Sequence, residues 1–145
     1  MTQKVKFKKN ESFNLIKLKN IINSKGKITK ILNKKDSTFF SFEELYISEA
    51  KKGFIKAWKK HKLVCLNILV LSGSIKFVFF NEKTKKFKKI TLSEFSNKRL
   101  FIPKNIWFGF EGLKNKNLLL SLASNSSNHK ELMRKKVKDF NYQWK

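Results

Sequence analysis

The 145-residue sequence contains one cysteine, one proline, five glycines and two histidines. The single cysteine, Cys65, excludes an internal disulfide, and its place inside an apolar run predicts a buried, inert thiol. No proline- or glycine-rich linker and no internal repeat divides the chain. We therefore expect one domain over residues 1–145, with 1–35 forming N-terminal strands or an arm.

Long apolar runs are also missing. The longest, such as Ile68–Leu71 and Ile75–Phe80, have the length of a β-strand, whereas a membrane-spanning helix needs about 20 apolar residues. The first residues, MTQKVKFKKNESF, are basic but lack the apolar centre of a secretory signal. These absences predict a protein without a membrane span, located in the cytoplasm.

Acidic residues are scarce, with 10 Asp and Glu against 34 Lys and Arg, for a net charge of +24. Such a charge ordinarily suggests a nucleic acid or an anionic surface as partner. However, only Arg99 and Arg134 are arginines, which bidentate recognition favours, and the lysines are spread along the whole chain. Lys, Asn, Ile and Phe, which have A/T-rich codons, dominate the composition, so mutational bias accounts for the charge. We expect no nucleic-acid partner, although the positive field would attract a nucleotide diphosphate.

Short apolar segments rich in aromatic and β-branched residues recur along the chain, bounded by turn residues, as in an all-β sandwich or barrel. They are Val5–Phe7, Lys27–Leu32, Thr38–Ile47, Phe54–Trp58, Leu63–Leu71, Ile75–Phe80, Phe87–Leu92, Leu100–Ile102, Ile106–Phe110 and Leu118–Ala123. Ser72-Gly73 has the brevity of a hairpin turn, and Asn81–Lys86 that of a polar hairpin loop. Only His129–Lys138 predicts a helix, with Asn128 as its cap.

The most informative segment is GFIKAWKKHKLVCLNILVLSG, from Gly53 to Gly73. Its spacing resembles the first motif of cupin barrels, G-x5-H-x-H-x4-E-x6-G. His61 lies at the second histidine, Lys59 replaces the first, and Leu66 replaces the glutamate. The resemblance implies a jelly-roll cupin fold, the double-stranded β-helix of the RmlC type.

A longer resemblance, to the nucleotide-sugar 3,5-epimerases, covers residues 36–145. It is closest to the branch related to dTDP-4-dehydrorhamnose 3,5-epimerase. The matching pieces are FEELYISEAKKGFIKAWKKHK, NILVLSGSIKFVFFNE, RLFIPKNIWFGFEGL and NHKELMRKKVKDFNYQW, in that order. The resemblance implies a homodimer whose pocket takes a nucleoside-diphosphate sugar in deoxysugar or polysaccharide biosynthesis.

The chemistry implied by this family is proton removal next to a 4-keto group, with no metal required. A histidine base takes the proton and a tyrosine returns one from the opposite face. The usual base position falls on Lys59, and no tyrosine lies in Leu118–Ser124, where the acid is expected. The aspartate that supports the base falls near Asn125.

The second cupin motif, aligned on Pro103, places Phe108 where a metal histidine is expected. His61 is then the one ligand retained out of four, which does not suffice for a transition metal. We therefore expect no metal and no other cofactor.

The candidate catalytic residues are His61 and Lys59, which share a face with Ile55 and Ala57 on a regular strand. Candidate substrate-binding residues flank the motifs or supply polar and cationic groups: Lys56, Trp58, Asn67, Arg99, Trp107 and Phe108. Each has a structural alternative, namely core packing for the aromatic residues, solvation for the charged ones and capping of a sheet irregularity for Asn67.

Three functions stay open at this point. The first is 3,5-epimerisation of a dTDP-4-keto-6-deoxyhexose or a related sugar nucleotide. The second is binding of a sugar nucleotide or glycan without catalysis, which the missing tyrosine favours. The third, binding to RNA or a membrane surface, rests on charge alone.

Overall fold

The computed structural model describes residues 13–125 and 130–145. The predicted strand Val5–Phe7 and the predicted cap Asn128 lie outside these residues, as does His129. The described elements are β1 (Asn14–Lys17), β2 (Lys19–Asn23), β3 (Gly26–Lys30), β4 (Glu44–Glu49), β5 (Ile55–His61), β6 (Leu66–Ser72), β7 (Ser74–Asn81), β8 (Lys86–Ser93), β9 (Lys98–Ile102), β10 (Trp107–Gly112), β11 (Leu118–Ala123), β12 (Leu132–Arg134) and the 3-10 turn η1 (Val137–Asp139).

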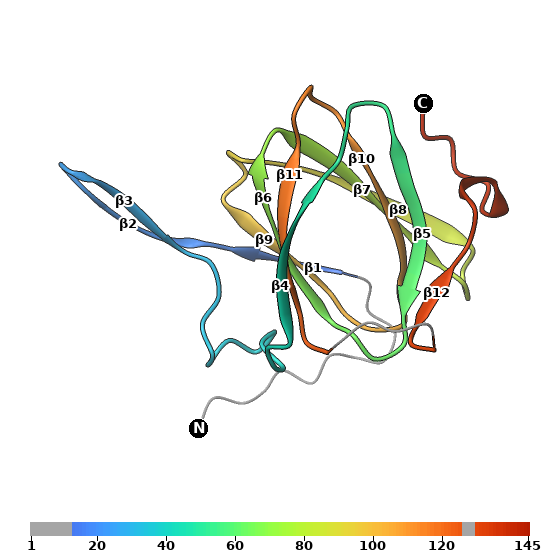
Figure 1. The fold of residues 1–145 in the computed structure, drawn as a ribbon, viewed down its shortest axis with the longest axis horizontal. Helices are drawn as coiled ribbons and strands as arrows, with labels where there is room; N and C mark the ends of the chain where they lie inside the picture. The colour runs from blue at the N-terminus through green and yellow to red at the C-terminus, as the bar shows by residue number, and fades with distance from the viewer. Residues whose placement is uncertain (1–12, 126–129) are drawn as a thin grey trace.

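Two five-stranded antiparallel sheets face each other and form the barrel (Figure 1). The first has the order β1-β9-β6-β11-β4 and the second the order β12-β5-β10-β7-β8. Their inner faces enclose the barrel core, which comprises Ala50, Val64, Leu66, Ile68, Val70, Ile75, Phe77, Phe79, Leu92, Leu100, Ile102, Phe108, Phe110, Leu119 and Ala123. The all-β jelly-roll prediction is confirmed.

Gly73 connects the two sheets. The sequence suggested a hairpin at Ser72-Gly73, but β6 pairs with β9 and β11, while β7 pairs with β10 and β8. The Gly73 φ of +78° favours glycine, and a Cβ there would lie 2.2 Å from the Lys116 carbonyl oxygen. The turn therefore serves as a corner of the barrel. The predicted hairpin loop Asn81–Lys86 does join paired strands, β7 and β8.

The β2–β3 hairpin extends away from the barrel as an arm (Figure 1). Three isoleucines on it are exposed, with Ile21 at 43%, Ile22 at 73% and Ile28 at 62% of their full accessible surface. Because these isoleucines are exposed, the hairpin lacks the apolar packing that a two-stranded sheet needs to be stable in water.

The predicted helix over His129–Lys138 is wrong. Leu132–Arg134 instead forms β12, which pairs with Lys59–His61 of β5, and only the single turn η1 is helical. The following tail, residues 135–145, lies over the outer face of the second sheet. There it forms the tail cluster: buried Trp58, Val78, Trp107 and Trp144, with Ile55, Ala57, Phe80, Phe87, Phe140 and Tyr142 packed against them. Strand pairing and aromatic burial outweigh local helix propensity in this segment.

Among residues 13–125 and 130–145, we find no helix whose length and hydropathy would let it cross a membrane.

Candidate functional site

A β-bulge in β5 determines which motif side chains enter the barrel. Lys59 pairs with Phe108, but Lys56 pairs with Phe110, so β5 has one residue more than β10 over this stretch. Phe108 and Phe110 belong to the barrel core, and directly paired residues share a face. Lys56 and Lys59 therefore face inward. The expectation that Ile55 and Ala57 share that face is wrong, because both pack in the tail cluster.

His61 lies at the end of β5, where it is buried with 9% of its surface exposed, and its ring lies against Phe108. Its Nδ1 is 2.9 Å from Oε2 and 3.1 Å from Oε1 of Glu131. A carboxylate accepts hydrogen bonds only, so Nδ1 carries the proton and donates it. In a neutral imidazole, Nε2 then keeps its lone pair and can accept a proton.

Glu131 is itself held firmly. It is 2% exposed, and its Oε1 accepts hydrogen bonds from the backbone N–H groups of Leu63 and Val64, both at 3.1 Å. Burial alone would raise the pKa of Glu131, but the hydrogen bonds from His61, Leu63 and Val64 outweigh it and lower the pKa. The carboxylate therefore stays ionised and fixes the orientation of the imidazole.

Lys59 lies two residues before His61 on the same inward face. Burial lowers the pKa of Lys59, and the like charges of Arg134, its partner on β12, and of Lys56 lower it further. An ammonium in such a position is closer to losing its proton than a solvated one. Lys59 can thus supply a positive charge to a developing anion or, when neutral, act as a base.

Tyr46 faces inward from β4, in the opposite sheet. Tyr46 pairs with Ser121 of β11. Ser121 lies between Leu119 and Ala123 on β11, and because these two residues belong to the barrel core, Ser121 and Tyr46 share the inward face. Burial raises the pKa of Tyr46, and a hydrogen bond from Ser121 offsets this only in part. The phenol therefore keeps its proton at neutral pH. The tyrosine that faces the interior therefore comes from β4, and not from β11, where the family resemblance placed it.

The predicted substrate-binding residues fall into three places. Phe108 lines the interior beside His61, and Lys56 lies at the rim, where its ammonium donates to the Glu49 carbonyl at 2.8 Å. Trp58 and Trp107 instead point outward into the tail cluster. The Trp58 indole donates to the Val137 carbonyl at 3.2 Å.

Asn67 and Arg99 lie on the outer face of the first sheet, away from His61. The Arg99 guanidinium donates to the Ile31 carbonyl at 2.7 Å, to the Thr38 hydroxyl at 2.8 Å, and to the Asn67 side-chain oxygen. Burial lowers the pKa of Arg99, and Asp36 opposes that shift. These contacts fasten the segment after the arm onto the sheet.

Glu131 and Tyr46 are candidate site residues that were not among those predicted from the sequence. The supporting carboxylate was expected near Asn125, but the Asn125 amide donates to the Leu63 carbonyl at 3.1 Å and no described contact joins it to His61. The available signal was that Glu131 is the only acidic residue in the basic segment HKELMRKKVK.

A cupin metal does not fit the residues present. Within the described ranges, no three His, Cys, Asp or Glu side chains gather as a metal site. His61 already uses Nδ1 for Glu131, and Lys59 and Phe108 occupy the positions of two other ligands.

The comparisons with known proteins agree with this architecture. The family model described as "FdtA: WxcM-like, C-terminal" matches residues 11–144. No curated protein matches the chain in a sequence search.

Several solved structures share the fold. A dTDP sugar isomerase from Desulfovibrio desulfuricans G20 is 24% identical with a TM-score of 0.81, over 92% of this chain and 91% of that one. A point mutant of the 3,4-ketoisomerase QdtA from Thermoanaerobacterium thermosaccharolyticum, in complex with TDP-4-keto-6-deoxyglucose, is 24% identical with a TM-score of 0.73, over 89% and 90%. The dTDP-4-dehydrorhamnose 3,5-epimerase from Elizabethkingia anophelis NUHP1 is 17% identical with a TM-score of 0.79, over 95% and 84%. With a family model matched over nearly its whole length, the chain belongs to the FdtA family of WxcM-like C-terminal domains.

Proposed function

We propose that this protein binds a thymidine-diphosphate 4-keto-6-deoxyhexose and moves a proton on the carbon next to the keto group. The single observation that carries the proposal is the buried His61–Glu131 pair inside a barrel of this family. An imidazole held by a carboxylate through Nδ1 presents Nε2 as a general base.

The 4-keto group acidifies the neighbouring C3–H bond of the sugar. His61 Nε2 takes that proton, the electron pair moves into a C3–C4 double bond, and negative charge develops on the C4 oxygen. Lys59, on the same wall, is placed to stabilise that oxygen electrostatically. This first step is common to two reactions, which differ in where a proton is returned.

Return of a proton to C4, with transfer of the C3 hydroxyl proton to the C4 oxygen, gives a 3-keto sugar and completes a 3,4-ketoisomerisation. The FdtA family match and the likeness to QdtA support this outcome. Catalytic groups on one face of the sugar ring suffice for this reaction, because His61 can take the proton from C3 and return it to the adjacent C4.

Return of a proton to C3 from the opposite face, with the same exchange at C5, gives the 3,5-epimerisation expected from the sequence. The observation that favours it is Tyr46, which keeps its proton and faces inward from the opposite sheet. We propose Tyr46 as the acid in that case, with Phe108 and Lys56 contacting the substrate.

A test separates these outcomes from binding alone. The protein is incubated with TDP-4-keto-6-deoxyglucose in deuterated buffer and the sugar is followed by NMR. Deuterium incorporation with a 3-keto product identifies the isomerase, and incorporation with inverted C3 or C5 identifies the epimerase. Saturable thermal stabilisation by the sugar nucleotide without incorporation identifies a non-catalytic binder, which Lys59 and Phe108 at the two histidine positions favour. The absence of both incorporation and stabilisation would overturn the proposal.

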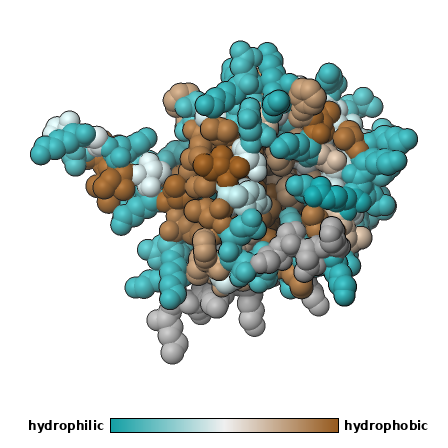
Figure 2. All heavy atoms as spheres, in the orientation of Figure 1, coloured by the Kyte–Doolittle hydropathy of each residue, from teal (hydrophilic) through white to brown (hydrophobic). Residues whose placement is uncertain are grey.

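We also propose that the protein is a homodimer in the cytoplasm. The exposed isoleucines of the arm have a counterpart in apolar side chains on the outer face of the first sheet, where Leu45 is 54% and Ile47 61% exposed. Figure 2 shows apolar atoms on the arm and on the neighbouring flank of the barrel. Sedimentation should give a dimer for the wild type and a monomer for Ile22→Lys. A monomeric wild type would overturn this part.

A further inference from the structure

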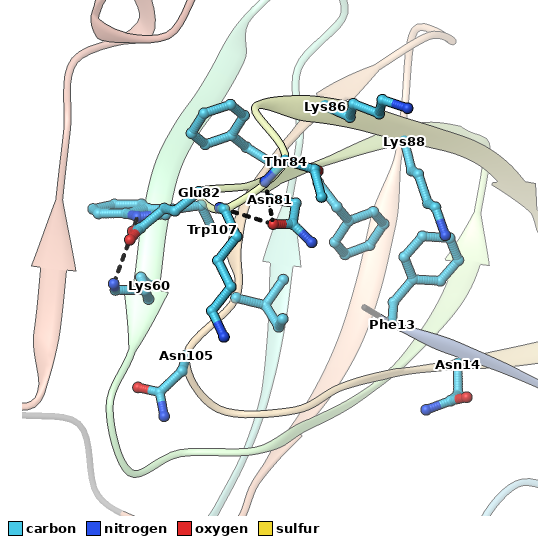
Figure 3. A pocket seen from close by; sticks show the side chains of 14 residues that line it. Phe13, Asn14, Lys60, Asn81, Glu82, Thr84, Lys86, Lys88, Asn105 and Trp107 are labelled. Carbon is cyan, nitrogen blue, oxygen red and sulfur yellow. Dashed lines mark hydrogen bonds and ion pairs between the residues drawn. The ribbon is translucent and has the colours of Figure 1, made fainter. Parts of the chain in front are cut away.

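Four loops meet at one end of the barrel, at the top of Figure 1, and form what we call the four-loop end. They join β4 to β5, β6 to β7, β8 to β9 and β10 to β11. The opposite end carries His61 and the groove between the β7–β8 turn and the start of β10 (Figure 3). The seven residues of β5 separate the two ends by about 20 Å. We propose that the four-loop end docks on the surface of an anionic phospholipid membrane, which leaves the His61 end facing solvent.

A buried asparagine holds these loops together. Asn117 is 0% exposed; its side-chain nitrogen donates to the Ala50 carbonyl at 2.8 Å, and its side-chain oxygen accepts from the Ser74 backbone N–H at 3.0 Å. The Glu94 backbone N–H donates to the Gly73 carbonyl at 3.3 Å, which joins the β8–β9 loop to the same group. Because these hydrogen bonds link one loop to the next, the four-loop end is a preformed surface.

Two phenylalanines project from this surface into solvent. Phe54, just before β5, is 68% exposed, and Phe95, in the β8–β9 turn, is 86% exposed, the highest value among the large apolar side chains described. The Phe95 backbone N–H donates to the Ser93 hydroxyl at 3.2 Å, in a turn where a small polar residue is the usual choice. Neither ring packs in the barrel core or in the tail cluster. Their exposure therefore indicates an apolar partner outside the chain.

Lysines around the two rings determine the charge of that partner. Four exposed lysines lie in these loops: Lys51, Lys52, Lys114 and Lys116. Among residues 13–125 and 130–145, none of the four forms an ion pair. Two carboxylates lie nearby, those of Glu49 and Glu94, and Glu94 already accepts the Gly73 N–H at 3.2 Å. In Figure 2, apolar atoms lie on either side of hydrophilic atoms at this end. The surface therefore favours an anionic partner.

The spacing of the two rings favours a membrane over a protein. In the first sheet, β6 and β11 lie between β9 and β4, so the loops that carry Phe95 and Phe54 are about 15 Å apart. A protein interface gathers its apolar contacts in one central, desolvated cluster. Separate aromatic rings among lysines instead suit a bilayer surface, where rings enter the headgroup layer and ammonium groups attract anionic lipid. A second copy is disfavoured, because the same lysines would face each other.

The test sediments the full chain with vesicles of phosphatidylcholine alone, or of phosphatidylcholine and phosphatidylglycerol in equal parts. The wild type should bind the mixed vesicles and not the neutral ones. Phe54→Ser and Phe95→Ser should each lower the partition coefficient about tenfold, since each removes a ring that enters the lipid. The matched control is Phe42→Ser, at the other end of β4 and 61% exposed, with an expected loss of less than about twofold.

A charge pair and an added indole complete the test. Lys114→Glu combined with Lys116→Glu should weaken binding about tenfold more than Lys34→Glu combined with Lys35→Glu, which makes the same charge change in the segment after the arm. Phe95→Trp adds an exposed indole whose emission should shift to shorter wavelength on the mixed vesicles, and Phe42→Trp should show no such shift.

Equal losses in the two lysine pairs would overturn the proposal, because they would report net charge alone, and so would a wild type that does not bind the mixed vesicles. Retention on immobilised polyglutamate without vesicle binding would assign the four-loop end to an acidic protein instead. A lower sedimenting mass for Phe95→Ser than for the wild type would assign Phe95 to a contact between subunits, and would refute the proposal as well. Deuterium exchange enters none of these measurements, so the proposed function can fail or hold independently.

Discussion

Glu131 and His61 come from segments 70 residues apart and meet as a buried pair, with the carboxylate 2.9 Å from Nδ1 of the ring. Two backbone N–H groups, those of Leu63 and Val64, hold the same carboxylate in place. Because Nδ1 is committed to Glu131, the pair leaves Nε2 as the acceptor nitrogen of the imidazole.

The first prediction is that Glu131→Gln abolishes most of the proton-transfer activity without unfolding the protein. A glutamine amide can donate to Nδ1, which would move the ring proton to Nε2 and remove the base. We expect the exchange rate to fall about a hundredfold or more. Deuterium incorporation measures it, with the exposed Glu49→Gln as control. Equal exchange rates in the two variants would refute the role given to Glu131.

The second prediction concerns pH. Because the pKa of Glu131 is lower in the folded than in the unfolded state, its stabilising effect is complete above the unfolded value, about 4.3, and is lost as pH falls through the folded value. The difference in unfolding free energy between the wild type and Glu131→Gln should therefore shrink between about pH 5 and pH 2. Urea titrations at several pH values measure this difference. A gap that stays constant in acid would contradict the prediction.

A third expectation is that Lys59→His exchanges deuterium about tenfold or more faster than Lys59→Met, because it adds a second imidazole two residues from His61 on the inward face. Lys59→Met serves as control, since it removes the charge without adding a base. It should raise stability by roughly 0.5–1 kcal/mol by removing repulsion from Lys56 and Arg134. Exchange that is no faster in Lys59→His than in Lys59→Met would argue against the base position.

The tail should contribute strongly to stability. Trp144 is 7% exposed and lies 5.4 Å from Trp58, ring to ring. Trp144→Ala should cost about 3–5 kcal/mol, and Trp144→Phe less than half of that. Urea unfolding gives the free energies, and a red shift of the remaining tryptophan emission should accompany the alanine variant. If Trp144→Ala unfolds at the wild-type midpoint, the tail cluster is not structural.

The final prediction tests whether Arg99 is a fastening residue or a diphosphate ligand. Arg99→Met leaves the Ile31 carbonyl, Thr38 and Asn67 without their donor, which should cost about 3 kcal/mol. Affinity for thymidine diphosphate, measured below the unfolding midpoint, should stay within about twofold of the wild type. A large loss of affinity would instead support the binding role expected from the sequence.

The strands from β5 to β11 could be located from the sequence because their aromatic and β-branched residues reflect burial, whereas β1, β2 and β12 fall in none of the predicted strand segments. The sequence also indicated the family, through spacings such as Gly53 to Gly73. The segment after His129 was misjudged, since its local preference is helical while its pairing partner, β5, lies far earlier in the chain. Glu131 was missed for that reason. The bulge in β5 was equally hidden, because it depends on the register with β10.

Because of that bulge, the inward-facing residues of β5 are even-numbered on one side of it and odd-numbered on the other. Even-numbered Lys56 faces inward on one side of it, and odd-numbered Lys59 and His61 do so on the other. Removing the single residue Ala57 would leave Lys56 opposite Phe110 and Lys59 opposite Phe108, so that β5 would pair regularly with β10 and both lysines would keep their face. A one-codon deletion would then remove the bulge without changing which side chains face the barrel interior.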